Sequence, residues 1–174
     1  MRIVVNSLPN AEAWIAGPED ESPDYARECH ELVDQLGLKG KVKFLGFQKL
    51  TDLLAKVGLV VLSSISEALP LVILEGYAAG VPTLSTDVGS CKQLVFGLPG
   101  EDAALGASGR VVRIADPQAL ADAAIELLSN PEIWHQASKA AIARVEKYYA
   151  QEIMFSSYRD LYEKNFQKSK EWQA

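Results

Sequence analysis

The sequence predicts an α/β domain built on a Rossmann-like, doubly wound parallel sheet and followed by a helical tail. Between residues 11 and 114, short apolar runs of strand length alternate with helical segments, which is the order of elements in parallel α/β sheets. The run LVVL that opens Leu59–Ser64 is continuously apolar, as expected for a strand that helices cover on both faces. Beyond residue 115 the pattern is helical only.

Five strands are expected, bounded mostly by Gly, Pro or polar turn residues. They are Ala11–Gly17, Lys41–Phe47, Leu59–Ser64, Val81–Gly89 and Gly109–Ile114.

Helices are expected between the strands, and the first of them has clear start and stop signals. Ser22 is placed to cap it, Pro23 suits its first position, and Gly37 suits its end. Apolar residues three and four positions apart predict one apolar face. They are Tyr25, Cys29, Leu32, Val33 and Leu36. Shorter helices are expected within 50–58, 70–80 and 90–97.

The two ends of the chain differ in how well they are defined. A helical tail is expected from about residue 116 to 174, with Asp116 as N-cap and Pro117 in the first turn. The segment Met1–Leu8 allows two interpretations. Its β-branched residues suit a strand, whereas its apolar spacing suits the last turns of a helix whose beginning is missing.

Length and composition indicate one globular domain with a sizeable core. The chain has 174 residues, of which 48% are hydrophobic and 23% charged, and a net charge of −6. A negative net charge argues against a general nucleic-acid binder. No apolar run reaches the roughly 20 residues of a membrane span, and the first residues do not resemble a signal peptide. We expect a cytoplasmic protein without a membrane span.

Cysteines and histidines give no sign of a metal site. Cys29 and Cys91 are far apart and lack metal-ligand spacing, so we expect two buried thiols in a reducing compartment. His30 and His135 lie in separate helical patterns and are expected to be structural or solvated.

The stretch SEALPLVILEGYAAGVP, residues 66–82, carries the clearest functional signal. It follows a strand and opens a helix near Pro70, and ligands of open α/β sheets bind at such strand ends. The backbone amides around the helix start, at Ala68, Leu69, Leu71 and Val72, can bind an anion such as a diphosphate.

Two glutamates flank these amides. Glu67 lies in the loop before the helix, and Glu75 lies about five residues into it. Carboxylates repel phosphate but accept hydrogen bonds from pairs of hydroxyls, so the arrangement suits a nucleotide sugar, with its ribose, diphosphate and hexose. Glu67 has an alternative interpretation as a solvated residue favoured by the helix dipole. We expect Glu75 to be buried, because its helix is apolar on nearly every face, and a buried carboxylate needs a partner.

The same stretch resembles the donor half of retaining glycosyltransferases of family four, which have the GT-B architecture of two Rossmann-like halves. The family's string S-E-G-x-P-x-x-x-x-E-A-x-A-x-G-x-P is matched here by 66–70, Glu75, Ala78, Gly80 and Pro82. The segments 11–18, 36–47, 85–95, 109–128 and 158–162 are also similar, so the resemblance covers nearly the whole chain. Within the family, the longer segment SEALPLVILEGYAAGVPTLSTDVGSC, residues 66–91, most resembles the branch that makes Pel-type bacterial exopolysaccharide.

The resemblance implies specific roles for residues of this chain. Glu75 would bind the ribose hydroxyls, and Glu67 would contact the hydroxyls of the donor sugar at the site of transfer. The backbone of 68–71 (Ala68, Leu69, Pro70 and Leu71) would meet the sugar and diphosphate. Gly46 and Phe47 match a loop that contacts the base, although Phe47 could equally be a core or rim aromatic. Ala68 replaces the family's usual glycine, which would cause strain if a positive φ were required.

The resemblance also implies that parts are missing. No metal or other cofactor is expected, and the family's Arg and Lys that stabilise the departing UDP would lie upstream of Met1, together with a central strand and the N-terminal acceptor-binding domain. We therefore expect residues 1–174 to be the nucleotide-sugar-binding C-terminal domain of a hexosyltransferase. We expect this fragment to be inactive alone, to bind UDP-sugar weakly at best, and to be able to form homo-oligomers that fill the gap.

Two other functions are compatible with the sequence. A nucleotide-sugar epimerase could share the architecture, but no acid/base residues of its own can be identified. A non-catalytic module for nucleotide binding or assembly could use the last helices as a docking face, with Phe155, Tyr158, Leu161, Tyr162 and Phe166. In the family the last helix packs across to the other half, which favours an intramolecular role for this face.

Overall fold

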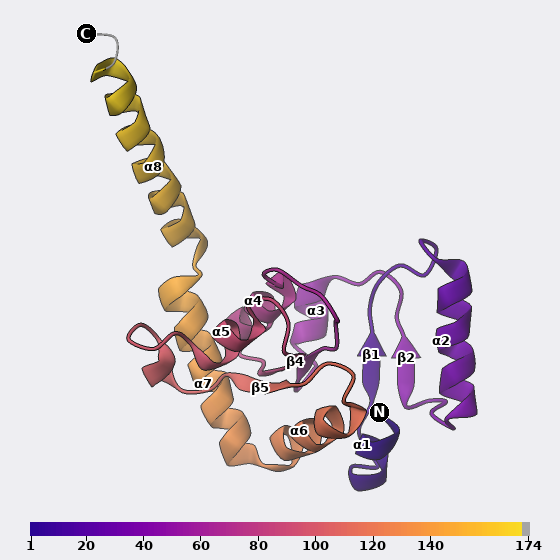
Figure 1. The fold of residues 1–174 in the computed structure, drawn as a ribbon. Coiled ribbons are helices and arrows are strands. Elements are labelled where there is room, and N and C mark those ends of the chain that lie inside the picture. Colours follow the sequence, from indigo (N-terminus) through magenta and orange to yellow (C-terminus); the bar gives the residue numbers. More distant parts are fainter. Residues whose placement is uncertain (172–174) are drawn as a thin grey trace.

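The computed structural model has the predicted α/β fold with parallel strands and a helical C-terminal segment (Figure 1). It describes the backbone of residues 1–171 and the side chains of residues 1–166. The last three residues of the expected tail, 172–174, lie outside the described residues.

The five strands lie where they were expected and are shorter than the apolar runs that predicted them. They are β1 (Ala13–Ile15), β2 (Val42–Phe44), β3 (Val60–Leu62), β4 (Thr83–Thr86) and β5 (Gly109–Val112). Every pairing is parallel.

Among the described residues, the parallel strands form two sheets. One sheet has the order β1-β2 and the other β3-β4-β5. The break lies between β1 and β3, where the resemblance predicted an absent strand. A cleft lined by residues of both strands occupies this position.

Helices connect the strands. They are α1 (Arg2–Ser7), α2 (Pro23–Gln35), α3 (Leu50–Leu54), α4 (Leu71–Ala78) and α5 (Cys91–Phe96). The helical α1 decides between the two interpretations of the N-terminal segment.

The apolar face predicted for α2 exists, but little of it is covered. The helix begins after Ser22, whose side chain makes no capping hydrogen bond, so that part of the prediction is wrong. It ends two residues before Gly37, whose φ is +64°. Tyr25 and Leu32 remain exposed, and no residue of α2 is buried. The helix stands beside β2 at the edge of the molecule (Figure 1).

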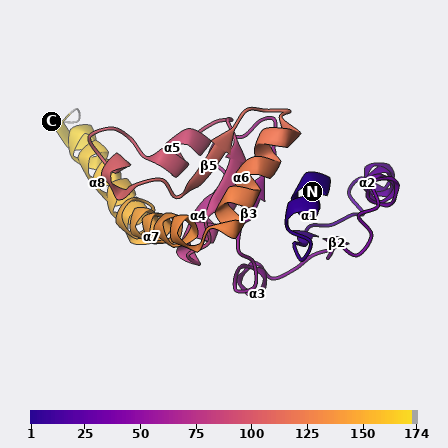
Figure 2. The ribbon, with the colours of Figure 1, turned by 90° about the horizontal axis from the view of Figure 1, so that it is seen from below.

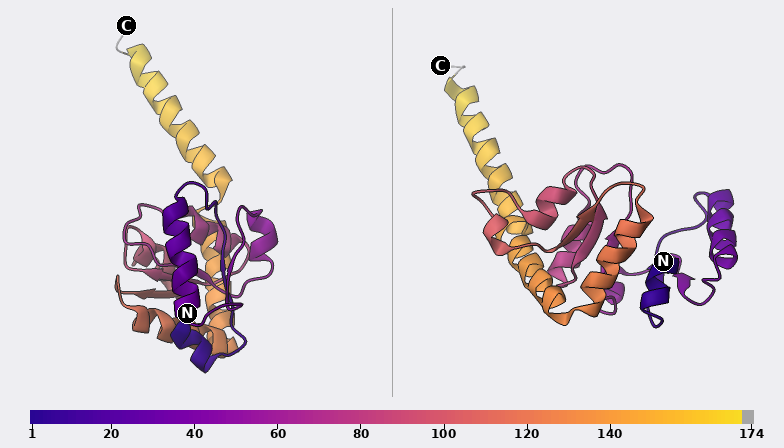
Figure 3. Two further views of the ribbon diagram at one scale, coloured as in Figure 1. Left: turned by 90° about the vertical axis from the view of Figure 1, so that its right-hand side faces the viewer. Right: turned by 60° about the horizontal axis from the view of Figure 1, so that its bottom comes forward.

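The C-terminal segment contains α6 (Pro117–Ser129), α7 (Pro131–Tyr148) and α8 (Gln151–Glu171). Asp116 caps α6 as predicted, because its Oδ1 accepts a hydrogen bond of 2.9 Å from the amide of Ala119. The helices α6 and α7 lie along the three-stranded sheet, whereas α8 projects away from the rest of the molecule (Figures 2 and 3).

The core is concentrated around the three-stranded sheet. One cluster joins α1 and α6 through Val4, Ala124 and Leu127, and includes Leu84 of β4. A second cluster joins α4, α5 and α7 through Ile73, Leu94 and Ala141. The two-stranded sheet contributes none of the buried residues of these clusters.

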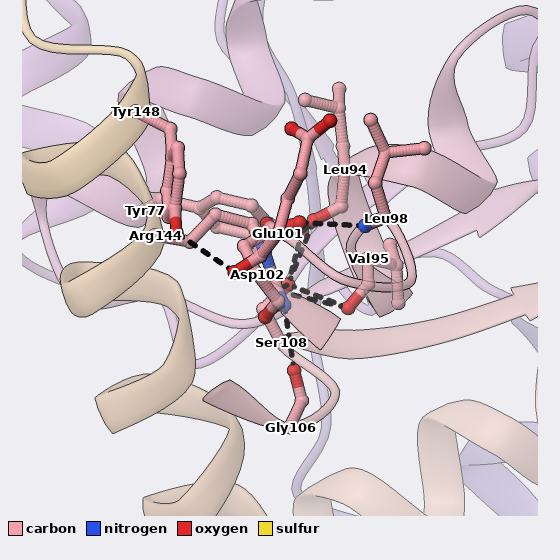
Figure 4. A network of polar contacts seen from close by, with 10 residues as sticks. All are labelled: Tyr77, Leu94, Val95, Leu98, Glu101, Asp102, Gly106, Ser108, Arg144 and Tyr148. Carbon is pink, nitrogen blue, oxygen red and sulfur yellow. Dashed lines mark hydrogen bonds and ion pairs between the residues drawn. The ribbon is translucent and has the colours of Figure 1, made fainter. Parts of the chain in front are cut away.

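A buried ion pair fastens α7 to the loop before β5 (Figure 4). Arg144 is fully buried and its Nε donates to Asp102 Oδ2 at 2.6 Å. The other guanidinium nitrogens donate to the carbonyls of Val95 and Gly106 and to the hydroxyl of Ser108. These contacts satisfy the cation, as a buried charge requires.

The cysteines are unpaired, and only one is buried. Cys91 is fully buried in α5, whereas Cys29 is half-buried in α2, which corrects the expectation of two buried thiols. The ring of His30 lies 3.9 Å from that of Phe44, and its Nε2 lies 2.8 Å from Glu19 Oε2, so His30 has a structural role. Within the described residues, no helix has the length and hydropathy needed to cross a membrane.

Candidate functional site

The predicted site begins at the N-terminus of α4. The helix starts at Leu71, and its N-cap, Pro70, makes no side-chain capping bond. The amides of Leu71 and Val72 therefore have no acceptor within the helix, and they lie at the positive end of the helix dipole. Leu69 and Leu71 are exposed beside them, whereas Pro70 is buried.

The loop that leads into α4 is fixed by hydrogen bonds from β4 and the turn after it. The hydroxyl of Thr86 donates to the carbonyl of Ser64 at 2.5 Å. The amide and the hydroxyl of Ser90 both donate to the carbonyl of Ala68, at 3.0 and 2.9 Å. Two neighbouring β–α connections thus hold each other in place.

Glu67 is oriented within this loop. The Ser64 hydroxyl donates to Glu67 Oε1 at 2.7 Å, and Glu67 is half-buried. One carboxylate oxygen is thus held by the protein, while Oε2 remains able to accept hydrogen bonds from a ligand.

Glu75 is exposed, which corrects the expectation that it is buried. The helix α4 buries Ile73, Gly76 and Tyr77, and Glu75 falls on the side that these residues leave uncovered. The argument that a buried carboxylate needs a partner therefore does not apply. Its side chain leans toward the helix N-terminus by the general geometry of helices, on the same end as the free amides.

Ala68 causes no backbone strain at this site. Among the described residues other than glycine, a positive φ occurs only at Ala115. The replacement of the family's glycine by Ala68 is thus compatible with the loop conformation.

Gly46 and Phe47 follow the carboxyl end of β2. Gly46 has a φ of +61° and open space where a side chain would project. Phe47 is 87% exposed, so the interpretation of Phe47 as a core aromatic is wrong. An exposed aromatic ring at a strand end offers an apolar face to a ligand.

Gly89 is a site residue that the sequence analysis missed. Its φ is +49°, and a Cβ placed there would lie 2.3 Å from the carbonyl oxygen of Glu67 and 2.6 Å from that of Ala68. Only glycine lets the turn after β4 approach the site loop this closely. The available signal was the Val-Gly-Ser pattern at the end of the expected strand Val81–Gly89, but which loop this turn contacts depends on the fold.

The large cleft of the molecule is a separate feature from this site. It has a volume of about 600 Å³ and lies between β1 and β3. Ser63 lines it, but none of the predicted site residues does. The described residues also contain no cluster of three or more His, Cys, Asp or Glu side chains that could hold a metal ion.

Parallel strands joined by helices that cover the sheet define the Rossmann-like class of α/β folds. The sequence profile of the family described as Glycosyl transferases group 1 matches residues 1–144. The chain belongs to this glycosyltransferase family.

Curated relatives support the same assignment. The chain is 34% identical over 133 residues to N-acetyl-alpha-D-glucosaminyl L-malate synthase of Bacillus anthracis, a match that covers 76% of this chain and 33% of the relative. It is 40% identical over 83 residues to the lipopolysaccharide core biosynthesis glycosyltransferase LpsE of Rhizobium meliloti. This match covers 47% of this chain and 23% of the relative. The chain thus spans about a third or less of these relatives.

Solved structures share the fold. Anabaena Alr3699/HepE in complex with UDP and glucose superposes with a TM-score of 0.78 at 22% identity, over 94% of this chain and 44% of that one. The C-terminal domain of the group 1 glycosyl transferase LpcC from Francisella tularensis superposes with a TM-score of 0.70 at 22% identity. The superposition covers 86% of this chain and 75% of that one.

Proposed function

We propose that the chain is the donor-binding part of a retaining glycosyltransferase that transfers a hexose from a UDP-sugar to a glycan. The observation that carries this proposal is the open N-terminus of α4 between Glu67 and Glu75. Membership of the glycosyltransferase family supports the reaction class. We further propose that the glycan is a bacterial exopolysaccharide of the Pel type.

The diphosphate would bind at the start of α4. The amides of Leu71 and Val72 can donate to its oxygens, and the helix dipole adds about half a positive charge at this end. The neighbouring amides of Ala68 and Leu69 precede the helix in the same loop. Because backbone donors and the dipole supply the attraction, we propose that donor binding needs no metal ion.

The two glutamates would recognise the groups on either side of the diphosphate. Glu75 would accept hydrogen bonds from the ribose hydroxyls, and Glu67 would do so from the hydroxyls of the donor sugar. Held by Ser64, Glu67 presents Oε2 in a defined direction, which orients the sugar for transfer. Gly46 and the exposed Phe47 would contact the base.

Several relatives are consistent with this substrate class. Alr3699/HepE has been solved with UDP, with UDP and glucose, and with UDP-glucose. An exopolysaccharide phosphotransferase of Streptomyces coelicolor is 34% identical over 126 residues, although this covers only 12% of that protein. The first similarity supports a UDP-sugar donor, and the second is consistent with an exopolysaccharide product.

We propose that residues 1–174 act together with an acceptor-binding domain in a longer protein and are inactive without it. The short coverage of the relatives is consistent with this arrangement. Measurable transfer of hexose by residues 1–174 alone would contradict it.

Calorimetric titration with UDP and UDP-glucose tests the proposal. We expect Glu75→Gln to weaken the binding of both ligands by roughly tenfold, because each loses hydrogen bonds to a charged group. We expect Glu67→Gln to weaken UDP-glucose binding and to leave UDP binding unchanged. Glu31→Gln, on the exposed face of α2, is the matched control. Equal UDP affinity of the unchanged chain and Glu75→Gln would contradict the assigned site.

A further inference from the structure

The turn between β4 and α5 carries two donors that meet at one carbonyl of the loop before α4. The amide of Ser90 donates to the carbonyl oxygen of Ala68 at 3.0 Å, and the Ser90 hydroxyl donates to the same oxygen at 2.9 Å. Two hydrogen bonds to one oxygen hold a peptide plane against rotation better than a single bond does. The orientation of the peptide group between Ala68 and Leu69 is therefore set by Ser90.

The hydroxyl of Ser90 is not used for the ordinary task of a serine at its position. Ser90 is the N-cap of α5, where a serine side chain commonly accepts a hydrogen bond from the second or third amide of its own helix. The side chain of Ser90 makes no such bond and donates to Ala68 instead. It thus serves the neighbouring loop and not its own helix.

The preceding peptide group of the loop faces the same turn. The carbonyl oxygen of Glu67 lies 2.3 Å from the position that a Cβ on Gly89 would occupy, whereas the carbonyl carbon of Glu67 lies 2.9 Å from it. Because the oxygen is the nearer atom, this carbonyl points to the turn. Two successive carbonyls, those of Glu67 and Ala68, are therefore directed at Gly89 and Ser90.

The amide groups of the same two peptides face the opposite side. A trans peptide holds its N–H antiparallel to its C=O, and the described peptide bonds are all trans. The N–H groups of Ala68 and Leu69 thus point away from the β4–α5 turn. Within the described part of the chain no group accepts from either amide, and both residues are exposed. Successive backbone amides that face one side can bind an anion together.

The hydrogen bonds to Ala68 also strengthen the donor on the other end of its peptide group. Hydrogen bonds in a chain polarise one another. A carbonyl that accepts two hydrogen bonds therefore makes the N–H of its own peptide, here that of Leu69, a better donor. The Ser90 hydroxyl supplies one of these two bonds, so it affects both the direction and the strength of the Leu69 amide.

We propose that Ser90 is a positioning residue for the diphosphate of the donor, and that it acts through the Ala68 carbonyl on the amides of Ala68 and Leu69. This role rests on the proposed function, in which these amides and those of the first turn of α4 bind the diphosphate. The Ser90 hydroxyl touches no ligand atom in this role. It keeps the loop amides directed at the phosphate oxygens, and recognition of the nucleoside does not depend on it.

The test titrates the ¹⁵N-labelled chain with UDP and with uridine, which lacks the phosphates, and follows the backbone amides by NMR. We expect Ser90→Ala to weaken UDP binding by about 3- to 10-fold, the effect of one lost hydrogen bond. Uridine binding is expected to stay unchanged. We also expect UDP to shift the amide signal of Leu69 in the unchanged chain, and to shift it less in Ser90→Ala.

Two further variants separate the hydroxyl from the rest of the side chain. Ser90→Thr keeps the hydroxyl, and we expect it to bind UDP as the unchanged chain does. Ser157→Ala removes a hydroxyl that donates to the carbonyl of Ile153 within α8. It is the matched control for the loss of a serine hydroxyl, and we expect it to leave the binding of both ligands unchanged.

The outcomes distinguish this role of Ser90 from the proposed function. Equal UDP affinity of Ser90→Ala and the unchanged chain would overturn the role of Ser90. An equal loss for UDP and uridine would also overturn it, because the hydroxyl would then support the loop as a whole. Neither result affects the proposed function if Glu75→Gln still weakens UDP binding. UDP binding that is absent, or that does not depend on Glu75, would remove both.

Discussion

The hydroxyl of Ser64 holds Glu67 by a hydrogen bond of 2.7 Å to Oε1. Ser64 is itself fixed through its carbonyl, which accepts from Thr86 on β4. The orientation of the proposed sugar-binding carboxylate is therefore set by the sheet and not by the loop alone.

Ser64→Ala tests this relationship. We expect UDP-glucose to bind about 3- to 10-fold more weakly, the effect of one lost hydrogen bond. We expect UDP binding to stay unchanged, because the proposed role of Glu67 is to contact the sugar alone. Calorimetry with both ligands measures the difference. Ser129→Ala, which removes a hydroxyl bonded to a helix carbonyl far along the chain, is the control. An equal loss for UDP and UDP-glucose would show that Ser64 acts on the whole loop.

Gly89→Ala tests the close approach of the β4–α5 turn to the site. A Cβ would collide with the carbonyl oxygens of Glu67 and Ala68, so the loop must shift. We expect a loss of about 1–3 kcal/mol in stability from backbone strain and collision, together with the loss of UDP binding. Urea unfolding and calorimetry measure the two effects.

Gly100→Ala is the matched control for that variant. Gly100 also has a positive φ, of +83°, but a Cβ there meets nothing within 4 Å. We expect Gly100→Ala to lose stability and to retain UDP binding. If both variants bound UDP normally, the Gly89 contact would have no part in shaping the site.

The Arg144–Asp102 pair predicts a large effect on stability. Asp102→Asn leaves a fully buried guanidinium without its anion, and breaking a buried pair on one side costs about 3–5 kcal/mol. Glu126→Gln, at the partly exposed Arg110–Glu126 pair, is expected to cost less than about 1 kcal/mol. Denaturant unfolding at neutral pH compares the two. Similar losses in both variants would contradict the structural importance of the buried pair.

The carboxyl group of Asp102 also makes the free energy of unfolding depend on pH in the acidic range. Burial raises the pKa of Asp102, but hydrogen bonds from the Leu98 amide and Arg144 outweigh burial and hold the pKa below its ordinary value of 3.8. The stabilisation is therefore present above pH 3.8 and is lost as the pH falls through the lower folded-state value. We expect Asp102→Asn to have a shallower loss of stability below pH 4. If stability below pH 4 fell equally steeply in Asp102→Asn and in the unchanged chain, the lowered pKa of Asp102 would be contradicted.

Tyr77 makes the free energy of unfolding depend on pH in the alkaline range. Burial raises the pKa of the Tyr77 hydroxyl from 10 to about 12, since the ionised form is disfavoured in the core. Its contribution to stability is complete below pH 10 and is lost as the pH rises from 10 to 12. We expect Tyr77→Phe to remove this part of the pH dependence, as followed by thermal unfolding between pH 9 and 12. If the stability of both proteins fell in the same way between pH 10 and 12, the prediction would be refuted.

Local signals in the sequence predicted most elements of the fold. The Asp116 cap, the turn at Gly37 and the apolar run of β3 depend on neighbouring residues only, and the structure places them as expected. The division into two sheets could not be derived from composition or periodicity, because it depends on which strands are neighbours.

The site was predictable in part. The position of Glu67 before α4 follows from a strand–loop–helix pattern, but its bond with Ser64 depends on the loop geometry. Glu75 was expected to be buried because α4 is apolar on nearly every face. Its exposure depends on which side of α4 the packed elements cover, and a helical pattern alone does not determine this.

The most direct test of the central claim is a crystal structure of residues 1–174 soaked with UDP. We predict that the diphosphate lies within hydrogen-bond distance of the amides of Leu71 and Val72, with the ribose hydroxyls at Glu75. UDP bound elsewhere, for example in the cleft between β1 and β3 with the α4 N-terminus empty, would contradict the account.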